Sequence, residues 1–177
     1  PVLHTSSFTA WTALPYAESK GRKSASEAQL LHGFRTQADL LSVAIEAAYE
    51  RAVRERVSLI IEGVHIHPAL VEQLPRHDDA VVIPVMLGVL KRKELQKRIK
   101  GRGTDAPARR AQRYLDNFDQ IWRLQTYLLS EADRVNTPII TNNDREKVFR
   151  EIMRATIGIL ASQCQSSAAE VFGTSSP

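Results

Sequence analysis

Apolar residues recur at every third or fourth position between residues 26 and 54, which predicts one long amphipathic helix. The residues of this apolar face are Leu30, Phe34, Ala38, Leu41, Ile45, Ala48 and Ala52. We expect the helix to begin at Ser26, because Ser26-Glu27-Ala28-Gln29 fits a capping box. Residues 1–26 show no sustained period and predict a loop with at most a short helix.

A strand is predicted directly after this helix, at residues 57–62. The run Leu59-Ile60-Ile61 is hydrophobic without alternation, which is typical of a parallel strand buried on both faces. The run ends at Glu62, and open α/β sheets bind their ligands at the carboxyl ends of strands. Glu62 is therefore either a Walker B-type acid that holds Mg²⁺ or water, or a solvated residue at a strand end.

The rest of the chain alternates between helical and strand patterns. Helices are expected at residues 69–75, 91–100, 109–132 and 143–159, the last opened by a capping box at 143–146, and strands at 80–87 and 138–141. Pro84 fits poorly inside a central strand, because proline donates no hydrogen bond to the ladder. This alternation predicts an α/β fold with a parallel sheet and helices on both faces. Three strands are few for such a sheet, which agrees with a missing piece before Pro1.

The composition is that of a globular protein with one domain. The chain has 177 residues and a mass of 19.8 kDa, with 43% hydrophobic and 25% charged residues. We expect a single domain at residues 1–161 and a flexible tail at 162–177. The longest apolar run, residues 80–90, is too short to cross a bilayer, and the single cysteine, Cys164, fits a cytoplasmic protein.

Positive charge is concentrated between Lys91 and Arg113, where ten residues are Lys or Arg. Glycines and Pro107 interrupt the helical pattern there, so one interpretation is a mobile lid at about 91–113 that clamps phosphate groups. The arginines available to it are Arg98, Arg102, Arg109, Arg110 and Arg113. A solvated basic surface is the second interpretation. A nucleic-acid patch is the third, and the absence of aromatic residues between 91 and 113 disfavours it.

Two histidines follow the first predicted strand. His65 and His67 would face the same side of a strand and could bind zinc, but no third ligand stands at a supporting spacing. A substrate contact or a packed loop histidine is therefore favoured. Near the N-terminus, the residues at 4–7 offer an imidazole and three hydroxyl groups, which suit an anionic ligand. Arg35 and Gln37 are expected on the polar side of the long helix.

The sequence contains no G-x-x-x-x-G-K-[ST] motif, and its eight glycines form no phosphate-binding loop. A nucleotide-dependent enzyme of this architecture needs such a loop. By chain order, the loop would lie before Pro1, so we expect the chain to be a piece of a longer protein.

Six stretches, taken in order, resemble the 2-phosphoglycerate kinase family of P-loop kinases. They are LHTSSF at 3–8, GFRxQ at 33–37, IIEGVHxxP at 60–68, RxxxR at 98–102, RYLxNFxxI at 113–121 followed by Gln125 and Tyr127, and PIIxN at 138–142. The resemblance runs from about residue 3 to about residue 159. It implies a three-layer αβα kinase fold that transfers the γ-phosphate of ATP, with Mg²⁺, to a phosphorylated small acid.

By motif position, the resemblance also implies roles for individual residues. Glu62 would be the Walker B-like acid that holds Mg²⁺ through water, Arg98 and Arg102 would be lid arginines, and Asn142 would lie near the adenine. The residues expected to bind the acceptor are His4, Thr5, Ser6, Ser7, Arg35, Gln37, His65 and Arg113.

Our first hypothesis is therefore the acceptor-site, Walker B and lid portion of an ATP-dependent small-molecule kinase, which would be inactive without its phosphate-binding loop. Its partners would be a nucleotide and a phosphorylated small molecule, with inositol phosphates as further candidate acceptors and no membrane. The alternative is a non-catalytic phosphate-binding or regulatory module. A third interpretation, an RNA-binding domain, predicts binding that depends steeply on salt concentration.

Overall fold

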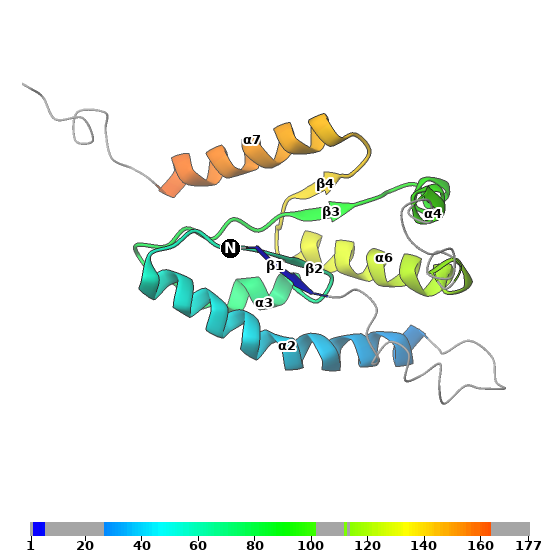
Figure 1. The fold of residues 1–177 in the computed structure, drawn as a ribbon, viewed down its shortest axis with the longest axis horizontal. Helices are drawn as coiled ribbons and strands as arrows, with labels where there is room; N and C mark the ends of the chain where they lie inside the picture. The colour runs from blue at the N-terminus through cyan, green and yellow to red at the C-terminus, as the bar shows by residue number, and fades with distance from the viewer. Residues whose placement is uncertain (1, 6–26, 102–111, 113, 164–177) are drawn as a thin grey trace, which may run out of the picture.

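A computed structural model describes residues 2–5, 27–101, 112 and 114–163 of the chain (Figure 1). The helices labelled in Figure 1 are α2 (Glu27–Glu55), α3 (Pro68–Gln73), α4 (Arg92–Gly101), α6 (Phe118–Arg134) and α7 (Arg145–Gln163). The strands are β1 (Val2–Thr5), β2 (Ile60–Gly63), β3 (Met86–Gly88) and β4 (Ile139–Thr141). No helix among these residues is long and apolar enough to cross a membrane.

The described strands form two parallel pairs. β1 pairs with β2, with the Cα atom of His4 opposite that of Glu62. β3 pairs with β4, with Met86 opposite Ile139. Helices connect the strands of each pair, as parallel pairing requires. The prediction of an α/β fold with parallel strands is thereby confirmed.

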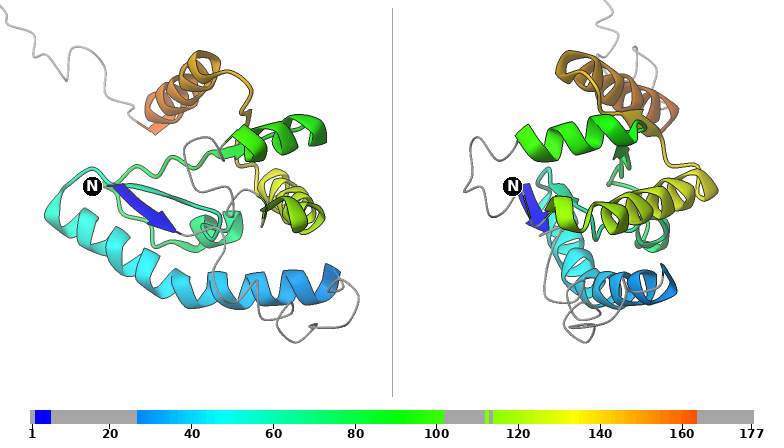
Figure 2. Two further views of the ribbon diagram at one scale, coloured as in Figure 1. Left: turned by 45° about the vertical axis from the view of Figure 1, so that its right-hand side comes forward. Right: turned by 90° about the vertical axis from the view of Figure 1, so that its right-hand side faces the viewer.

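Helix α6 is the element on which the others are assembled. It contacts α2 and α3 on one side and the pair β3–β4 on the other, while α7 packs against β4. Figures 1 and 2 show the resulting order, in which α6 and the pair β3–β4 lie between α2 and α7. The main cluster of buried side chains joins Phe34 and Ala38 of α2 to Leu124 and Leu128 of α6.

Two glycines end strands at positions where a side chain would be strained or crowded. Gly63, which ends β2 directly after Glu62, has a φ of 149°, a conformation that side chains with a Cβ rarely adopt. A Cβ on Gly88, the last residue of β3, would lie 2.8 Å from Leu129 Cδ2. Gly88 therefore allows α6 to approach the carboxyl end of β3 closely.

Most predicted elements are confirmed. The helix predicted at 26–54 is α2, and the elements predicted at 69–75, 91–100 and 138–141 correspond to α3, α4 and β4 within a few residues. Ser26 lies outside the described residues. The tail was predicted at 162–177, but residues 162 and 163 form the end of α7, and the rest of the predicted tail lies outside the described residues. The last helix opens one residue later than expected, because Asp144 Oδ1, rather than Asn143, accepts the Lys147 N–H at 2.7 Å.

Three expectations about strands were wrong. Residues 2–5 were expected in a loop, but they form β1 by pairing with β2. The strand expected at 80–87 is limited to Met86–Gly88, so it starts after Pro84, which has no N–H to donate to a ladder. The first predicted strand was expected to be buried, but Ile60 is 63% exposed, because few contacts join β2 to described elements other than β1.

The helix predicted at 109–132 is interrupted at Asn117. Residues 114–116 are helical, and α6 then begins at Phe118 after a non-helical Asn117. Residues 109–111 and Arg113 lie outside the described part. Arg92 of α4 forms an ion pair with Asp119, and its guanidinium lies 5.1 Å from the centre of the Phe118 ring. The start of α6 is therefore joined to the start of α4.

Candidate functional site

Helix α2 presents one predicted acceptor residue to solvent and buries another. Arg35 is exposed, as expected. Gln37 is only 4% exposed, so its predicted place on the polar side of the helix was wrong. Position 37 lies three residues after the fully buried Phe34, and this spacing puts it on the same helix face.

His67 caps the short helix α3. Its Nδ1 accepts a hydrogen bond from the Ala69 N–H at 3.2 Å, and Pro68 occupies the first helical position, where no N–H is needed. An accepting Nδ1 carries no proton, so the neutral ring holds its hydrogen on Nε2. The cap therefore determines which nitrogen of His67 can donate.

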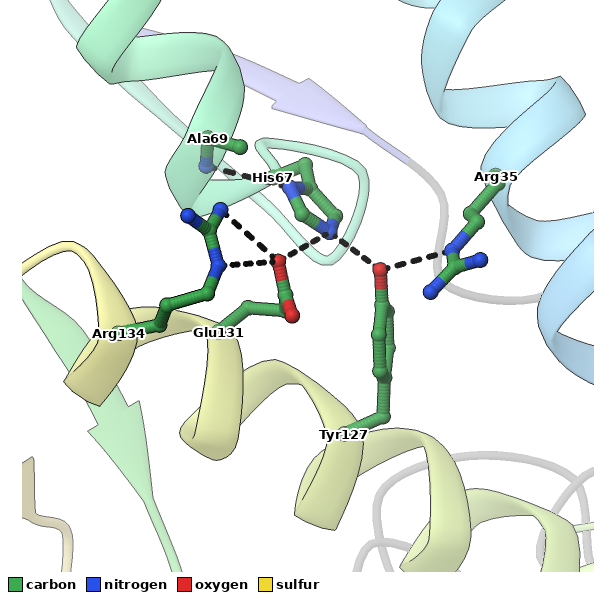
Figure 3. Close-up of polar contacts among 6 residues, drawn as sticks. All are labelled: Arg35, His67, Ala69, Tyr127, Glu131 and Arg134. Atoms are coloured by element: carbon green, nitrogen blue, oxygen red, sulfur yellow. Dashed lines mark hydrogen bonds and ion pairs between the residues drawn. The ribbon is translucent and has the colours of Figure 1, made fainter.

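Tyr127 of α6 receives two hydrogen bonds on its hydroxyl oxygen (Figure 3). His67 Nε2 lies 2.7 Å from Tyr127 Oη and is the donor, because its Nδ1 accepts from Ala69. Arg35 Nε donates to the same oxygen at 2.9 Å. Three separate elements, α2, the β2–α3 connection and α6, thus meet at one phenolic oxygen.

Charged groups of α6 surround this meeting point. Glu131 Oε2 lies 4.0 Å from His67 Nε2 and 3.2 Å from Arg134 Nη2. Burial lowers the pKa of His67, and Arg35 and Arg134 add to this effect, while Glu131 opposes it. The hydrogen bond to Tyr127 raises the pKa of Arg35. At neutral pH, His67 is therefore neutral and Arg35 is charged.

His65 is fully buried and stacks on Phe34, with ring centres 5.7 Å apart and planes 17° from parallel. Within the described residues, neither of its ring nitrogens has a hydrogen-bond partner. In this arrangement, the ring has no access to a ligand in solvent. The role of His65 as an acceptor contact therefore stays a prediction, which would require the loop to open.

Glu62 stands at the carboxyl end of β2, as predicted, and is exposed. Its neighbour across the strand pair is His4, and Thr5 pairs with Gly63, so the ends of β1 and β2 are side by side. The structure thus places the backbone of two predicted acceptor residues next to the predicted Walker B-like acid. Ser6 and Ser7, which follow β1, lie outside the described residues.

Arg98 and Asn142, predicted as a lid arginine and a nucleotide contact, are in direct contact. Arg98 Nη1 donates to Asn142 Oδ1 at 3.0 Å, and Arg98 Nη2 donates to Glu94 Oε1 at 3.0 Å. Asn142 follows β4 directly, and its N–H donates to the Gly88 carbonyl at the end of β3. The guanidinium of Arg98 is therefore held at the carboxyl ends of β3 and β4. Arg102 and Arg113 lie outside the described residues.

The described residues contain no group of three or more His, Cys, Asp or Glu side chains that could hold a metal ion. A zinc site at His65 and His67 has no support from this geometry, because one ring is stacked on Phe34 and the other is used by Ala69 and Tyr127. Mg²⁺ differs from zinc, since it keeps several waters and takes as few as one protein carboxylate. An exposed carboxylate at a strand end, such as Glu62, fits that requirement.

Sequence reasoning missed the roles of His67, Tyr127 and Glu131. The sequence placed Tyr127 in a motif stretch without predicting a polar role for it, yet its hydroxyl makes long-range hydrogen bonds. One signal was available for His67: a polar residue directly before a proline is typical of a helix start. No such signal indicated the hydrogen bonds of Tyr127 with His67 and Arg35, which are 60 and 92 positions away in the sequence.

We expect the chain to lose stability as the pH falls below about 6.5, the ordinary pKa of histidine. Burial lowers the pKa of His65, so the unfolded chain binds more protons than the folded chain below that pH. Each unit of lowering reduces the free energy of unfolding by about 1.4 kcal/mol at acid pH. Thermal unfolding between about pH 5 and pH 8 measures this dependence.

The matched variants are His65→Leu and His32→Gln. His65→Leu should make the acid side of the profile less steep and leave the contribution of His67, whose pKa is also lowered by burial. His32→Gln, on the exposed side of α2, should leave the profile unchanged. A profile that is equally steep in His65→Leu would show that His65 does not cause the loss.

Curated relatives of the chain are 2-phosphoglycerate kinases. The protein of Pyrococcus horikoshii is 34% identical over 164 residues, which are 90% of this chain and 50% of that protein. The protein of Pyrococcus furiosus is 31% identical over 164 residues, with the same shares, and that of Thermococcus kodakarensis is 33% identical over 153 residues, 86% of this chain and 48% of that protein. The chain thus spans about half the length of these relatives.

These matches confirm the family resemblance that the sequence motifs indicated. No family model matches the chain, and no solved structure matches it.

Proposed function

Because this chain is a relative of the 2-phosphoglycerate kinases along 90% of its length, we propose that it is the acceptor-site, Walker B-like and lid part of an ATP-dependent kinase. Its substrate would be a phosphorylated small molecule such as 2-phosphoglycerate, and its fold would be the three-layer P-loop kinase fold. The similarity over 164 residues carries this proposal. The placement of Glu62 and Arg98 at the carboxyl ends of strands supports it.

In this proposal, Glu62 holds Mg²⁺ through water at the end of β2. Mg²⁺ and ATP would supply the charge neutralisation and the phosphoryl group, and a glycine-rich loop outside residues 1–177 would hold the β- and γ-phosphates. Glu62 is exposed, and its Cα atom lies opposite that of His4 near the end of β1. This exposed position supports the proposal, because a carboxylate that orders a metal-bound water needs contact with solvent.

Arg98 would stabilise the negative charge of the phosphoryl group during transfer. Its guanidinium is positioned from two sides, by Asn142 and by Glu94, and its side chain is 33% exposed. A preorganised guanidinium stabilises developing charge without reorganising during the reaction. The proposed lid at about 91–113 includes Arg98 and also Arg102.

We expect Arg98→Ala, in the full-length gene product, to lower kcat by about tenfold to a hundredfold, because a charge that acts in the transition state is lost. Steady-state kinetics with saturating ATP and acceptor measure this effect. Lys97→Ala removes an exposed positive charge from the adjacent position of α4 and serves as the control. Equal losses in the two variants would indicate a general effect of basic charge.

A panel of acceptors tests the substrate class. The full-length gene product should release ADP from ATP in the presence of 2-phosphoglycerate, and more slowly with an inositol phosphate or with an unphosphorylated glycerate. ADP release that does not depend on any acceptor would contradict the proposal. The non-catalytic module is disfavoured, because the matched relatives are named as kinases.

A further inference from the structure

The guanidinium of Arg35 is held at its Nε atom, while its two Nη groups are available to a ligand. Its Nε donates to Tyr127 Oη at 2.9 Å, and its Cζ lies 5.0 Å from the centre of the Tyr127 ring. Within the described part of the chain, its two Nη groups form no hydrogen bond or ion pair. This end of a guanidinium has the fork geometry that binds a carboxylate or a phosphate through two parallel hydrogen bonds.

The hydroxyl hydrogen of Tyr127 is also left for a further acceptor. The oxygen already accepts from Arg35 Nε and from His67 Nε2, and neither of these groups can accept the hydroxyl hydrogen in return. An O–H whose oxygen accepts two hydrogen bonds, one from a charged group, is a stronger donor because such bonds polarise one another. The Tyr127 hydroxyl and the Arg35 Nη groups are therefore hydrogen-bond donors that lie close together.

We infer that Tyr127 is a positioning residue for acceptor binding: it holds Arg35 by Nε so that the Nη groups and the phenolic hydroxyl can bind one oxyanion of the acceptor. This inference rests on the proposed function, and the oxyanion is a phosphate or a carboxylate of the phosphorylated acceptor. Holding the long arginine side chain in advance reduces the entropy that is lost when the ligand binds. Figure 3 shows Arg35 approaching Tyr127 from α2, opposite His67.

His67 stabilises this arrangement because its role as the N-cap of α3 determines which of its ring nitrogens donates. Because Nδ1 accepts from Ala69, Nε2 must donate, and Tyr127 therefore cannot turn its hydroxyl hydrogen toward His67. The charged groups near His67 are Glu131 and Arg134 of α6 and Arg35 and Asp39 of α2. The hydrogen of the Tyr127 hydroxyl is thus directed away from the His67 ring.

Two variants test the inference in the full-length gene product. Tyr127→Phe removes the hydroxyl and keeps the ring against Phe34. His67→Asn keeps a side-chain acceptor for the cap of α3 but no longer reaches Tyr127. Tyr49→Phe is the matched control, since it too removes a tyrosine hydroxyl that is hydrogen-bonded, in this case to the Pro75 carbonyl.

Tyr127→Phe should raise the KM for the acceptor by about threefold to thirtyfold and leave kcat and the KM for ATP within about twofold. His67→Asn should raise the acceptor KM by a smaller factor, and Tyr49→Phe should leave it unchanged. An unchanged acceptor KM in Tyr127→Phe, or an equal rise in the KM for ATP, would overturn the inference. A merely structural role would instead lower thermal stability in both tyrosine variants without this separation of the two KM values.

Titration with inorganic phosphate separates this inference from the proposed function. The Arg35 Nε–H resonance should shift as phosphate binds, and Tyr127→Phe should weaken this binding by about the same factor as the acceptor KM. If the wild type transfers no phosphate from ATP but shows this titration, the proposed kinase activity fails and the anion site stands. No shift at Arg35, or equal phosphate affinity in Tyr127→Phe, overturns the anion site.

Discussion

Glu62→Gln in the full-length gene product is expected to lower kcat by about two to four orders of magnitude, with little change in the KM for the acceptor. The amide keeps the size of the side chain but removes the negative charge that would order Mg²⁺ and its water. Glu62 stands at the carboxyl end of β2, and the φ of 149° at Gly63 turns the chain away directly after it. Steady-state kinetics over a range of Mg²⁺ concentrations measure the effect.

Glu72→Gln is the control for this prediction. Glu72 is an exposed glutamate on α3, outside the strand ends, and its neutralisation should leave kcat unchanged. Near-normal turnover in Glu62→Gln would remove Glu62 from the mechanism. A loss of similar size in both variants would point to a general effect of net charge on the protein.

Phe34→Ala is expected to lower the free energy of unfolding by about 3–5 kcal/mol, a large share of the stability of an ordinary domain. The ring of Phe34 is completely buried, and it packs with Leu124 and Leu128 where α2 meets α6. It also stacks on His65 and meets the Tyr127 ring edge-on, with centres 6.2 Å apart. Its removal therefore leaves a cavity next to an imidazole that has no hydrogen-bond partner among the described residues. Urea unfolding measures the loss.

Phe149→Ala provides a matched comparison. Phe149 lies on α7 and is 64% exposed, so its truncation should change the free energy of unfolding by less than about 0.5 kcal/mol. Comparable losses in the two variants would mean that the contact between α2 and α6 is not the centre of the core.

Much of the helical structure could be predicted because the apolar periodicity of a helix extends over many residues. The period of α2 extends over about eight turns, so a single polar residue in the apolar stripe does not hide it. The error at Gln37 came from its polar residue type, which suggested the exposed face, although its position three residues after Phe34 lies on the buried face. Strands were harder, because β1 and β3 are only four and three residues long. Such short segments become strands by pairing with β2 and β4, which local sequence does not encode.

The sequence predicts candidate site residues but not how they are arranged in space. The motifs predict roles for Arg35, Glu62, Arg98 and Asn142, and the structure adds that Arg98 forms a hydrogen bond with Asn142. Tyr127 forms hydrogen bonds with His67 and Arg35, which precede it in the sequence by 60 and 92 positions. Such contacts depend on how α2 and α6 pack, and no spacing rule reports on that packing.

His65 and His67 have different environments, although the two were considered together at the level of sequence. His65 and His67 lie two residues apart, yet one ring is fully buried against Phe34 and the other forms a hydrogen bond at each nitrogen. The helix start at Pro68 explains the difference, because it turns His67 back toward the first amides of α3. The two residues therefore do not project together from one strand.

Transfer of phosphate to 2-phosphoglycerate tests the central claim most directly. The full-length gene product is incubated with ATP labelled at the γ-phosphate, Mg²⁺ and 2-phosphoglycerate, and the products are separated. We expect the label to appear in a bisphosphorylated product in amounts equal to the ADP released, and to disappear from that product in Glu62→Gln. Label that passes only to water, or remains in ATP although 2-phosphoglycerate binds, would contradict the claim that this chain is part of such a kinase.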